Sequence, residues 1–182
     1  GGRYTNGPMV AEYLSEMLNV SIQNYAVSAA TTGDKNLFDS LLPEGVLPRT
    51  KRTGVLMQIA EYRRDLGGAK ADPKTLFIYW AGSNDIYKAT AMDLDERIAK
   101  AGKNIEMGLP QLVALGAERI LVATRTARPK LDSENNEFGI RLNEVVAKTV
   151  KAANEKLSAD IELFDAYAIT ADMKKNPGSY GF

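Results

Sequence analysis

The chain has 182 residues, of which 45% are hydrophobic, and its 23 basic and 23 acidic side chains give a formal net charge of zero. This length and composition suit one soluble domain with a sizeable core, and the balanced charge argues against nucleic acid or an anionic membrane as a partner. No apolar run approaches the roughly 20 residues of a transmembrane helix, no signal peptide follows Gly1, and the absence of cysteine excludes disulfides and Cys-ligated metal sites.

The first part of the chain combines a helix, a strand, a long loop and a second helix. Apolar residues at helical spacing predict a helix over residues 9–18, and a short strand is expected over residues 21–27. Residues 29–53 are mostly polar, are interrupted by Pro and Gly, and predict a long surface loop. A loop of this length in a compact domain is often functional. A modest amphipathic helix is then expected over residues 54–66.

The central feature is a continuous apolar run over residues 76–81, which predicts a strand buried on both faces. Gly82 lets the backbone turn sharply at the carboxyl end of this strand. Ligands bind at that end in open α/β sheets. Asn84 can there present a neutral amide N–H to developing negative charge. The alternative is that Asn84 or Asp85 caps the next helix.

The second half continues the alternation of helices and strands. The expected order is helix 93–115, strand 119–124, polar loop 124–136, helix 138–157 and strand 161–164. Pro110 is expected to kink or split the first of these helices. The tail, residues 174–182, has turn composition and is expected to end without a further element.

This alternation predicts one α/β domain over residues 1–182, built as a three-layer α/β/α sandwich around a mostly parallel, flavodoxin-like sheet. An unrelated nucleotide-binding domain of this class would need a glycine-rich phosphate loop, which the sequence lacks. The chain also contains no histidine and no Ser-x-x-Lys motif. Ser-His-Asp, Cys-His and Ser-Lys catalysis therefore cannot be completed within these 182 residues.

Two motifs resemble sequence blocks of the GDSL, or SGNH, hydrolase superfamily of serine esterases and lipases. The sequence Gly-Ser-Asn-Asp at residues 82–85 resembles the block that carries the oxyanion-hole Asn of that family, at Asn84. The sequence Asn-Tyr-Ala-Val-Ser-Ala-Ala-Thr-Thr at residues 24–32 resembles the block that carries its oxyanion-hole Gly, a position occupied here by Ala29. Two further segments resemble stretches of microbial and fungal members, residues 2–14 and residues 176–182.

The resemblance implies an SGNH hydrolase fold and an ester hydrolase. Asn84 and the Ala29 N–H are then expected to stabilise the oxyanion of a tetrahedral intermediate. Because the Cβ of Ala29 disfavours a positive φ, this donor is expected to be less well placed than that of a glycine. The alternative for Ala29 is a tight turn without a catalytic role.

Asn6, Ser28 and Ser83 are expected to contact the substrate, a small ester such as a lipid or an acylated carbohydrate. Without a base neither serine is expected to act as a nucleophile. Asp165 is given a structural role, and Trp80 is expected to pack in its strand or to line a substrate groove. No metal or organic cofactor is implied, and the resemblance favours a secreted protein.

Two blocks of the family are missing from these residues: the Gly-Asp-Ser block belongs before Gly1 and the Asp-x-x-His block belongs after Phe182. The Ser-block strand lies inside the family's sheet, so its removal would leave unpaired backbone groups on strands 21–27 and 76–81. We therefore expect flanking segments to complete the sheet, with another chain or a rearranged sheet as alternatives. The alternative function is a non-catalytic binding or interaction module with the same fold.

Overall fold

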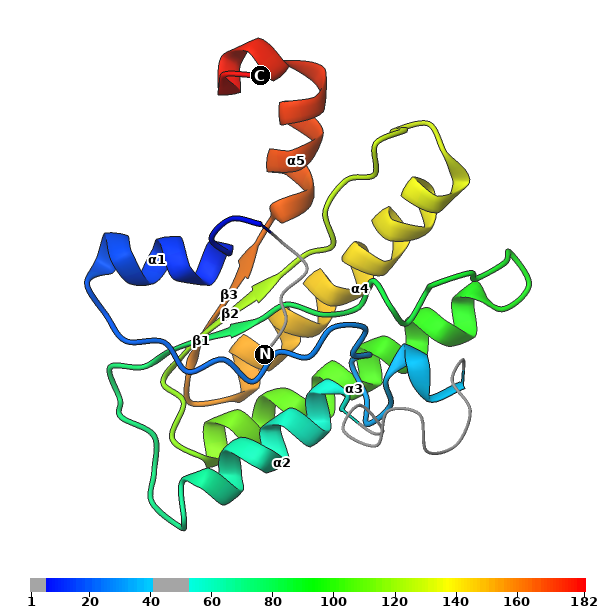
Figure 1. Cartoon of the computed structure of the whole chain (residues 1–182). Helices are drawn as coiled ribbons and strands as arrows, with labels where there is room; N and C mark the ends of the chain where they lie inside the picture. Colours follow the sequence, from blue (N-terminus) through cyan, green and yellow to red (C-terminus); the bar gives the residue numbers. More distant parts are fainter. Residues whose placement is uncertain (1–5, 41–52) are drawn as a thin grey trace.

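The computed structural model describes residues 6–40 and 53–182, and it shows a parallel sheet with helices packed along it (Figure 1). The strands are β1 Leu76–Tyr79, β2 Arg119–Ala123 and β3 Asp160–Phe164, which pair in parallel in that order. The helices are α1 Val10–Leu18, α2 Val55–Asp65, α3 Leu94–Ala114, α4 Glu134–Lys156 and α5 Ala166–Lys175, with short 3₁₀ helices η1 Leu37–Ser40 and η2 Pro177–Tyr180. The α/β fold with a parallel sheet expected from the sequence is confirmed.

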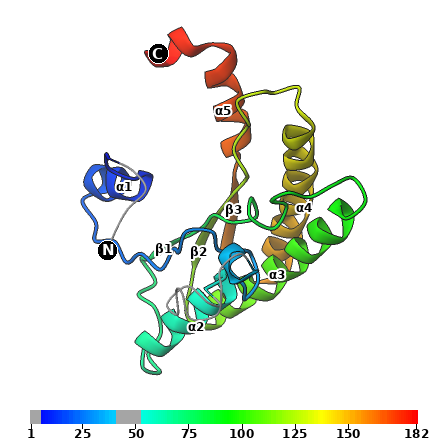
Figure 2. The ribbon, with the colours of Figure 1, turned by 45° about the vertical axis from the view of Figure 1, so that its right-hand side comes forward.

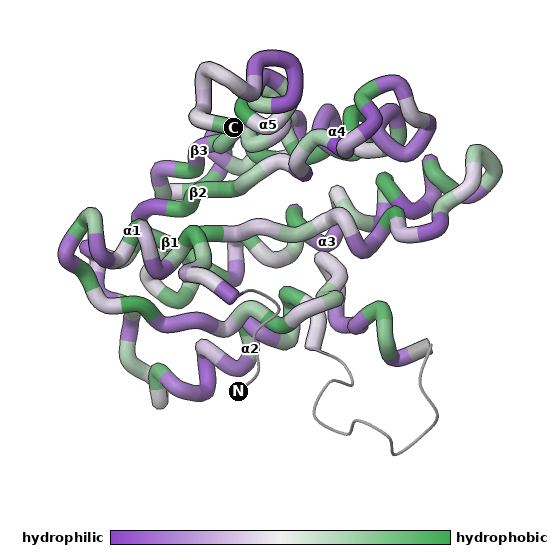
Figure 3. The backbone as a smooth tube through the Cα atoms, turned by 45° about the horizontal axis from the view of Figure 1, so that its top comes forward, coloured by the Kyte–Doolittle hydropathy of each residue, from purple (hydrophilic) through white to green (hydrophobic). Residues whose placement is uncertain are grey.

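One face of the sheet forms the core with α3 and α4. Side chains alternate along each strand, so Tyr79, Ile120 and Ile161 point to the same face, and all three are buried. Ring carbon Cε2 of Tyr79 lies 3.5 Å from where a Cβ on Gly108 of α3 would stand, which places α3 against this face. Figures 1 and 2 show α2, α3 and α4 on the same side of the sheet. In Figure 3, β1 is coloured mostly as hydrophobic, whereas the colour of α3 alternates between hydrophobic and hydrophilic along the helix.

The opposite face of β1 is open, which corrects the expectation of a strand buried on both faces. Leu76, Ile78 and Trp80 are 45–46% exposed. α1 lies on this side of the sheet (Figure 2), but none of its residues is buried, so it does not cover the strand. β1 is buried on one face and exposed on the other because α2, α3 and α4 pack on one side of the sheet in the described part of the chain.

The strand predicted over residues 21–27 is wrong. The segment forms no sheet pairing among the described residues, and Ala26 N–H instead donates to the Asn24 side chain at 2.9 Å. A strand needs a neighbour for its backbone groups. In the described part of the chain β1 pairs only with β2, so no ladder reaches residues 21–27.

Some helices begin at other residues than expected, because a capping side chain sets where the helix starts. α4 begins at Glu134, four residues early, because the Ser133 hydroxyl accepts the Asn136 N–H at 3.3 Å as an N-cap. α5 was not predicted; Asp165 caps it by accepting the Ala168 N–H at 3.0 Å. The tail was expected to end without a further element, but it contains the short 3₁₀ helix η2. The structural role expected for Asp165 agrees with this cap. α3 runs unbroken through Pro110 instead of splitting there.

Candidate functional site

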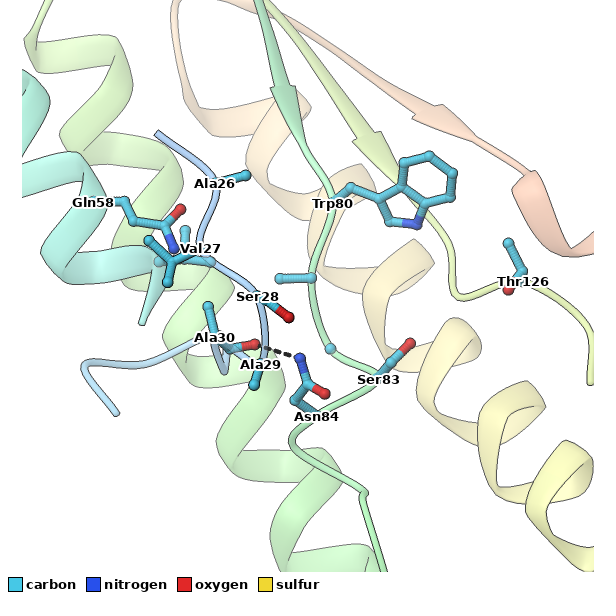
Figure 4. A pocket seen from close by; sticks show the side chains of 13 residues that line it. Ala26, Val27, Ser28, Ala29, Ala30, Gln58, Trp80, Ser83, Asn84 and Thr126 are labelled. Carbon is cyan, nitrogen blue, oxygen red and sulfur yellow. Dashed lines mark hydrogen bonds between the residues drawn. The ribbon is translucent and has the colours of Figure 1, made fainter. Parts of the chain in front are cut away.

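A cavity of about 390 Å³ lies at the carboxyl end of β1 (Figure 4). One wall is formed by residues 26–30 and the facing wall by residues 80–84. α2 adds Val55 and Gln58, and the loop after β2 adds Thr126. This is the edge at which open α/β sheets bind ligands.

Four of the five residues predicted for the site line this one cavity. Ser28 and Ala29 lie on one wall, and Ser83 and Asn84 lie on the other. Asn6 is exposed and is not among the lining residues, so its contact with substrate stays a prediction. Ser28 and Ala29 thus line the same cavity as Ser83 and Asn84, from which they are about 55 positions apart in sequence.

Asn84 spans the two walls and does not cap a helix. It lies in a turn over residues 83–88, whereas α3 begins only at Leu94. Its Nδ2 donates to the Ala30 carbonyl at 2.8 Å (Figure 4). This bond fixes the side chain but uses only one of the two N–H groups of the amide, and the second is available to a ligand.

Ala29 has the backbone conformation of a glycine. Its φ is +64°, in the left-handed region. Its carbonyl accepts the Leu37 N–H at 2.8 Å, whereas its own N–H has no partner among the described residues. The expected penalty of the Cβ is therefore present as backbone strain of roughly 1–2 kcal/mol, and the turn is formed nonetheless.

Replacing Ala29 with glycine is therefore expected to stabilise the protein. Relief of the strained φ outweighs the extra backbone entropy of glycine in the unfolded chain, which leaves a net gain of about 0.5–1 kcal/mol. Ala30→Gly is the matched control, because Ala30 is buried and does not have a positive φ. We expect it to destabilise by about 1 kcal/mol. Urea unfolding of both variants tests this, and equal destabilisation by the two would contradict a left-handed Ala29.

Gly82 shapes the facing wall. Its φ of +120° is a conformation that residues with a side chain rarely adopt, which confirms the sharp turn expected after the strand. A Cβ at this position would lie 3.2 Å from Leu142 of α4, so the turn also packs closely on the core. The polar residues of the turn are thereby presented at the end of β1.

The loop after β2 forms a third border of the cavity, and hydrogen bonds to α4 hold it in place. The Asn143 side chain accepts the Arg125 N–H at 2.8 Å and donates to the Arg125 carbonyl at 3.0 Å. The Arg125 guanidinium is buried against Asn135, and burial, followed by the charge of Arg128, lowers its pKa to about 10. Trp80 Nε1 donates to the Thr124 carbonyl at 3.0 Å, which fixes the indole at the rim.

Asp85 was predicted only as a possible cap, but it binds the opposite wall. It accepts the N–H of Thr32 at 3.0 Å and the Thr32 hydroxyl at 2.6 Å. Burial raises the pKa of the Asp85 carboxyl, and the hydrogen bonds from Thr32 partly oppose that shift. Thr32 lies 53 positions away, and no local pattern in the sequence signals this pairing.

The described residues contain neither a histidine that could act as a base for Ser28 or Ser83 nor a cluster of metal-ligating side chains. The whole chain has no histidine, and no group of three metal-ligating side chains occurs within residues 6–40 and 53–182. Over the same residues, no helix has the length and hydrophobicity needed to cross a membrane. The cavity offers the Ala29 N–H and the Asn84 amide as hydrogen-bond donors. The hydroxyls of Ser28, Ser83 and Thr126 and the amide of Gln58 also belong to its lining.

Comparison with known proteins identifies a family for this chain. Residues 1–182 match the family model described as GDSL-like Lipase/Acylhydrolase. A search of curated proteins gave no match. The family match spans the chain from end to end and includes both walls of the cavity.

Proposed function

The chain belongs to the family of GDSL-like lipases and acylhydrolases, and we propose from this premise that its cavity is the oxyanion-binding side of an ester-hydrolysing site. The observation that carries the proposal is the meeting of two donors in one cavity. These are the Ala29 N–H, which has no partner among the described residues, and the second amide N–H of Asn84. Donors fixed in advance around developing negative charge are the largest single contribution in many acyl-transfer enzymes.

In the proposed reaction, a serine hydroxyl outside these 182 residues attacks the acyl carbonyl of an ester while a histidine, also outside them, takes the proton. The carbonyl oxygen becomes an oxyanion, which accepts hydrogen bonds from Ala29 N and Asn84 Nδ2. Collapse of this intermediate expels the alcohol, and water then releases the acid from the acyl-serine. Ser28, Ser83 and Asn6 are proposed to contact the substrate, a lipid or an acylated carbohydrate.

We further propose that residues 1–182 form a single domain whose sheet takes one more strand. The edge of β1 that faces away from β2 has no strand partner in the described part of the chain, and residues 21–27 run without a ladder. A parallel strand between the two would satisfy both and would end at the cavity, where its final residue could present the serine. A structure of the complete polypeptide with no strand on this edge of β1 would contradict the proposal.

Reaction with an organophosphonate tests the catalytic proposal. We expect the complete polypeptide that contains residues 1–182 to hydrolyse a short p-nitrophenyl ester and to lose this activity as it gains the mass of one phosphonyl group. A folded, complete polypeptide that neither turns over esters nor takes up the probe would instead favour the non-catalytic module. The Cβ of Ala29, which narrows the approach to its N–H, is the feature of the cavity that favours that alternative.

A further inference from the structure

Two consecutive side chains of the turn after β1 hold the loop that carries Ala29. Asn84 donates to the Ala30 carbonyl at the cavity, as described above. Asp85 accepts both the N–H and the hydroxyl of Thr32, deeper in the protein. The two bonds to Thr32 fix the direction of the carboxylate as well as its distance.

A third residue ties this pair to the core. Asn104 Nδ2 of α3 donates to the Thr32 hydroxyl at 3.0 Å, and the same hydroxyl donates to Asp85. Thr32 is fully buried, and a Cβ on the adjacent Gly33 would lie only 2.9 Å from Asn104 Nδ2. We call these three residues, Asp85, Thr32 and Asn104, the Asp85 clamp. The clamp joins the loop that carries Ala29, the turn after β1 and helix α3 through hydrogen bonds.

Asp85 is half-buried, and a carboxylate in such a position holds a loop at a cost in free energy. Desolvation opposes its charge, and apolar contacts of similar volume often stabilise a fold as well or better. What the carboxylate supplies is geometry, since it accepts two bonds from one residue in a fixed orientation. The clamp is also placed where geometry matters, because Ala29 lies three residues before Thr32 and Asn84 directly precedes Asp85.

We infer that Asp85 is a positioning residue that, through Thr32, fixes the separation of the Ala29 N–H from the Asn84 amide. The inference rests on the proposed function, because the separation matters for catalysis only if the two groups share an oxyanion. Within residues 6–40 and 53–182, losing the clamp leaves the Asn84–Ala30 bond as the hydrogen bond that joins the two walls at the cavity. A shift of about 1 Å in a reacting geometry can lower the rate by about 10²-fold.

A pair of substitutions at Thr32 separates positioning from stability. Thr32→Val keeps the shape but removes the hydroxyl, whereas Thr32→Ser keeps the hydroxyl but leaves a methyl-sized cavity. In the complete polypeptide we expect Thr32→Val to lower kcat on a p-nitrophenyl ester by about 10–100-fold with little change in KM. Thr32→Ser should lower Tm by a few degrees and leave kcat within about threefold of the wild type. Active sites are counted by organophosphonate titration, so loss of folded protein does not enter kcat.

Thr170→Val is the control for removal of a hydrogen-bonded hydroxyl outside the clamp. Thr170 accepts the Ala127 N–H at 2.9 Å and donates to the Ala166 carbonyl in α5. We expect it to lower Tm without lowering kcat per active site. Equal kcat values for the wild type, Thr32→Val and Thr32→Ser would overturn the inference, as would equal losses of kcat in Thr32→Val and Thr170→Val.

Crystal structures of the two Thr32 variants give a readout that does not need activity. The inference predicts that the separation of Ala29 N from Asn84 Nδ2 changes by about 1 Å in Thr32→Val and is unchanged in Thr32→Ser. If the wild type did not hydrolyse esters, the proposed function would fail, and the crystal structures alone would then test whether the clamp positions Ala29 N and Asn84 Nδ2. An unchanged separation in Thr32→Val would then refute the clamp, and a changed one would uphold its positioning role.

Discussion

Replacing Asn84 with alanine is expected to lower kcat of the complete polypeptide by about 10²–10³-fold, which corresponds to roughly 2.7–4 kcal/mol of lost transition-state stabilisation. The reason is that Asn84 supplies one of the two proposed donors and is held in place by its bond to the Ala30 carbonyl. KM should change little, because the oxyanion forms only after attack. Initial rates on a short p-nitrophenyl ester, normalised to titrated active sites, measure the effect.

Ser83→Ala is the matched control for Asn84→Ala, because Ser83 is the adjacent residue and lines the same cavity. As a proposed substrate contact its loss should raise KM and leave kcat within a few-fold of the wild type. The assignment of Asn84 would be wrong if Asn84→Ala and Ser83→Ala gave the same kcat. Thermal unfolding of both variants separates the loss of the Ala30 bond from the loss of catalysis.

Replacing Gly54 with alanine is expected to cause the largest loss of stability among single-methyl changes around the site. A Cβ on Gly54 would lie 2.2 Å from the Gly33 carbonyl oxygen and 2.8 Å from the carbonyl carbon of Asp34. Both contacts are with backbone, so no rotamer change can relieve them. The first turn of α2 is bonded to the same loop, with Leu56 N–H donating to the Gly33 carbonyl at 3.0 Å.

We therefore expect Gly54→Ala to lower the free energy of unfolding by about 3 kcal/mol, the upper part of the range for overpacking, and to lower kcat as the Ala29 loop shifts. Urea unfolding measures the first effect. Gly178→Ala is the control, since a Cβ there meets nothing within 4 Å and the backbone is not in the left-handed region. It should change stability by less than about 0.5 kcal/mol. A similar small change for Gly54→Ala would show that α2 does not pack on this loop as described.

Much of the fold follows from local patterns. The continuous apolar runs predicted β1, β2 and β3, and helical periodicity predicted α1 to α4, because these signals are set by burial of one face or stripe. The errors lie where a neighbour decides the outcome. Residues 21–27 have the composition of a strand, but strand pairing needs a partner that the described residues do not provide. The polar loop expected over residues 29–53 is seen only in part, since residues 41–52 lie outside the described residues.

Only the part of the candidate site that lies in the two motif blocks could be predicted from the sequence. The blocks at residues 24–32 and 82–85 identified Ala29 and Asn84, which the structure brings to one cavity. The Asp85 clamp could not be found from the sequence, because its three members are separated by 53 and 72 positions. The left-handed backbone conformation of Ala29 could not be predicted from the sequence either. Alanine rarely adopts this conformation, and only the tertiary structure requires it here.

Ala29 and Asn84 are proposed to bind an oxyanion together. The most direct test is a crystal structure of the complete polypeptide after reaction with an organophosphonate, whose phosphonyl oxygen stands in for the oxyanion of the tetrahedral intermediate. We expect this oxygen to lie within about 3.1 Å of both Ala29 N and Asn84 Nδ2, with the phosphorus bonded to a serine outside residues 1–182. A phosphonyl oxygen that contacts neither donor, or a label on Ser28 or Ser83, would contradict it.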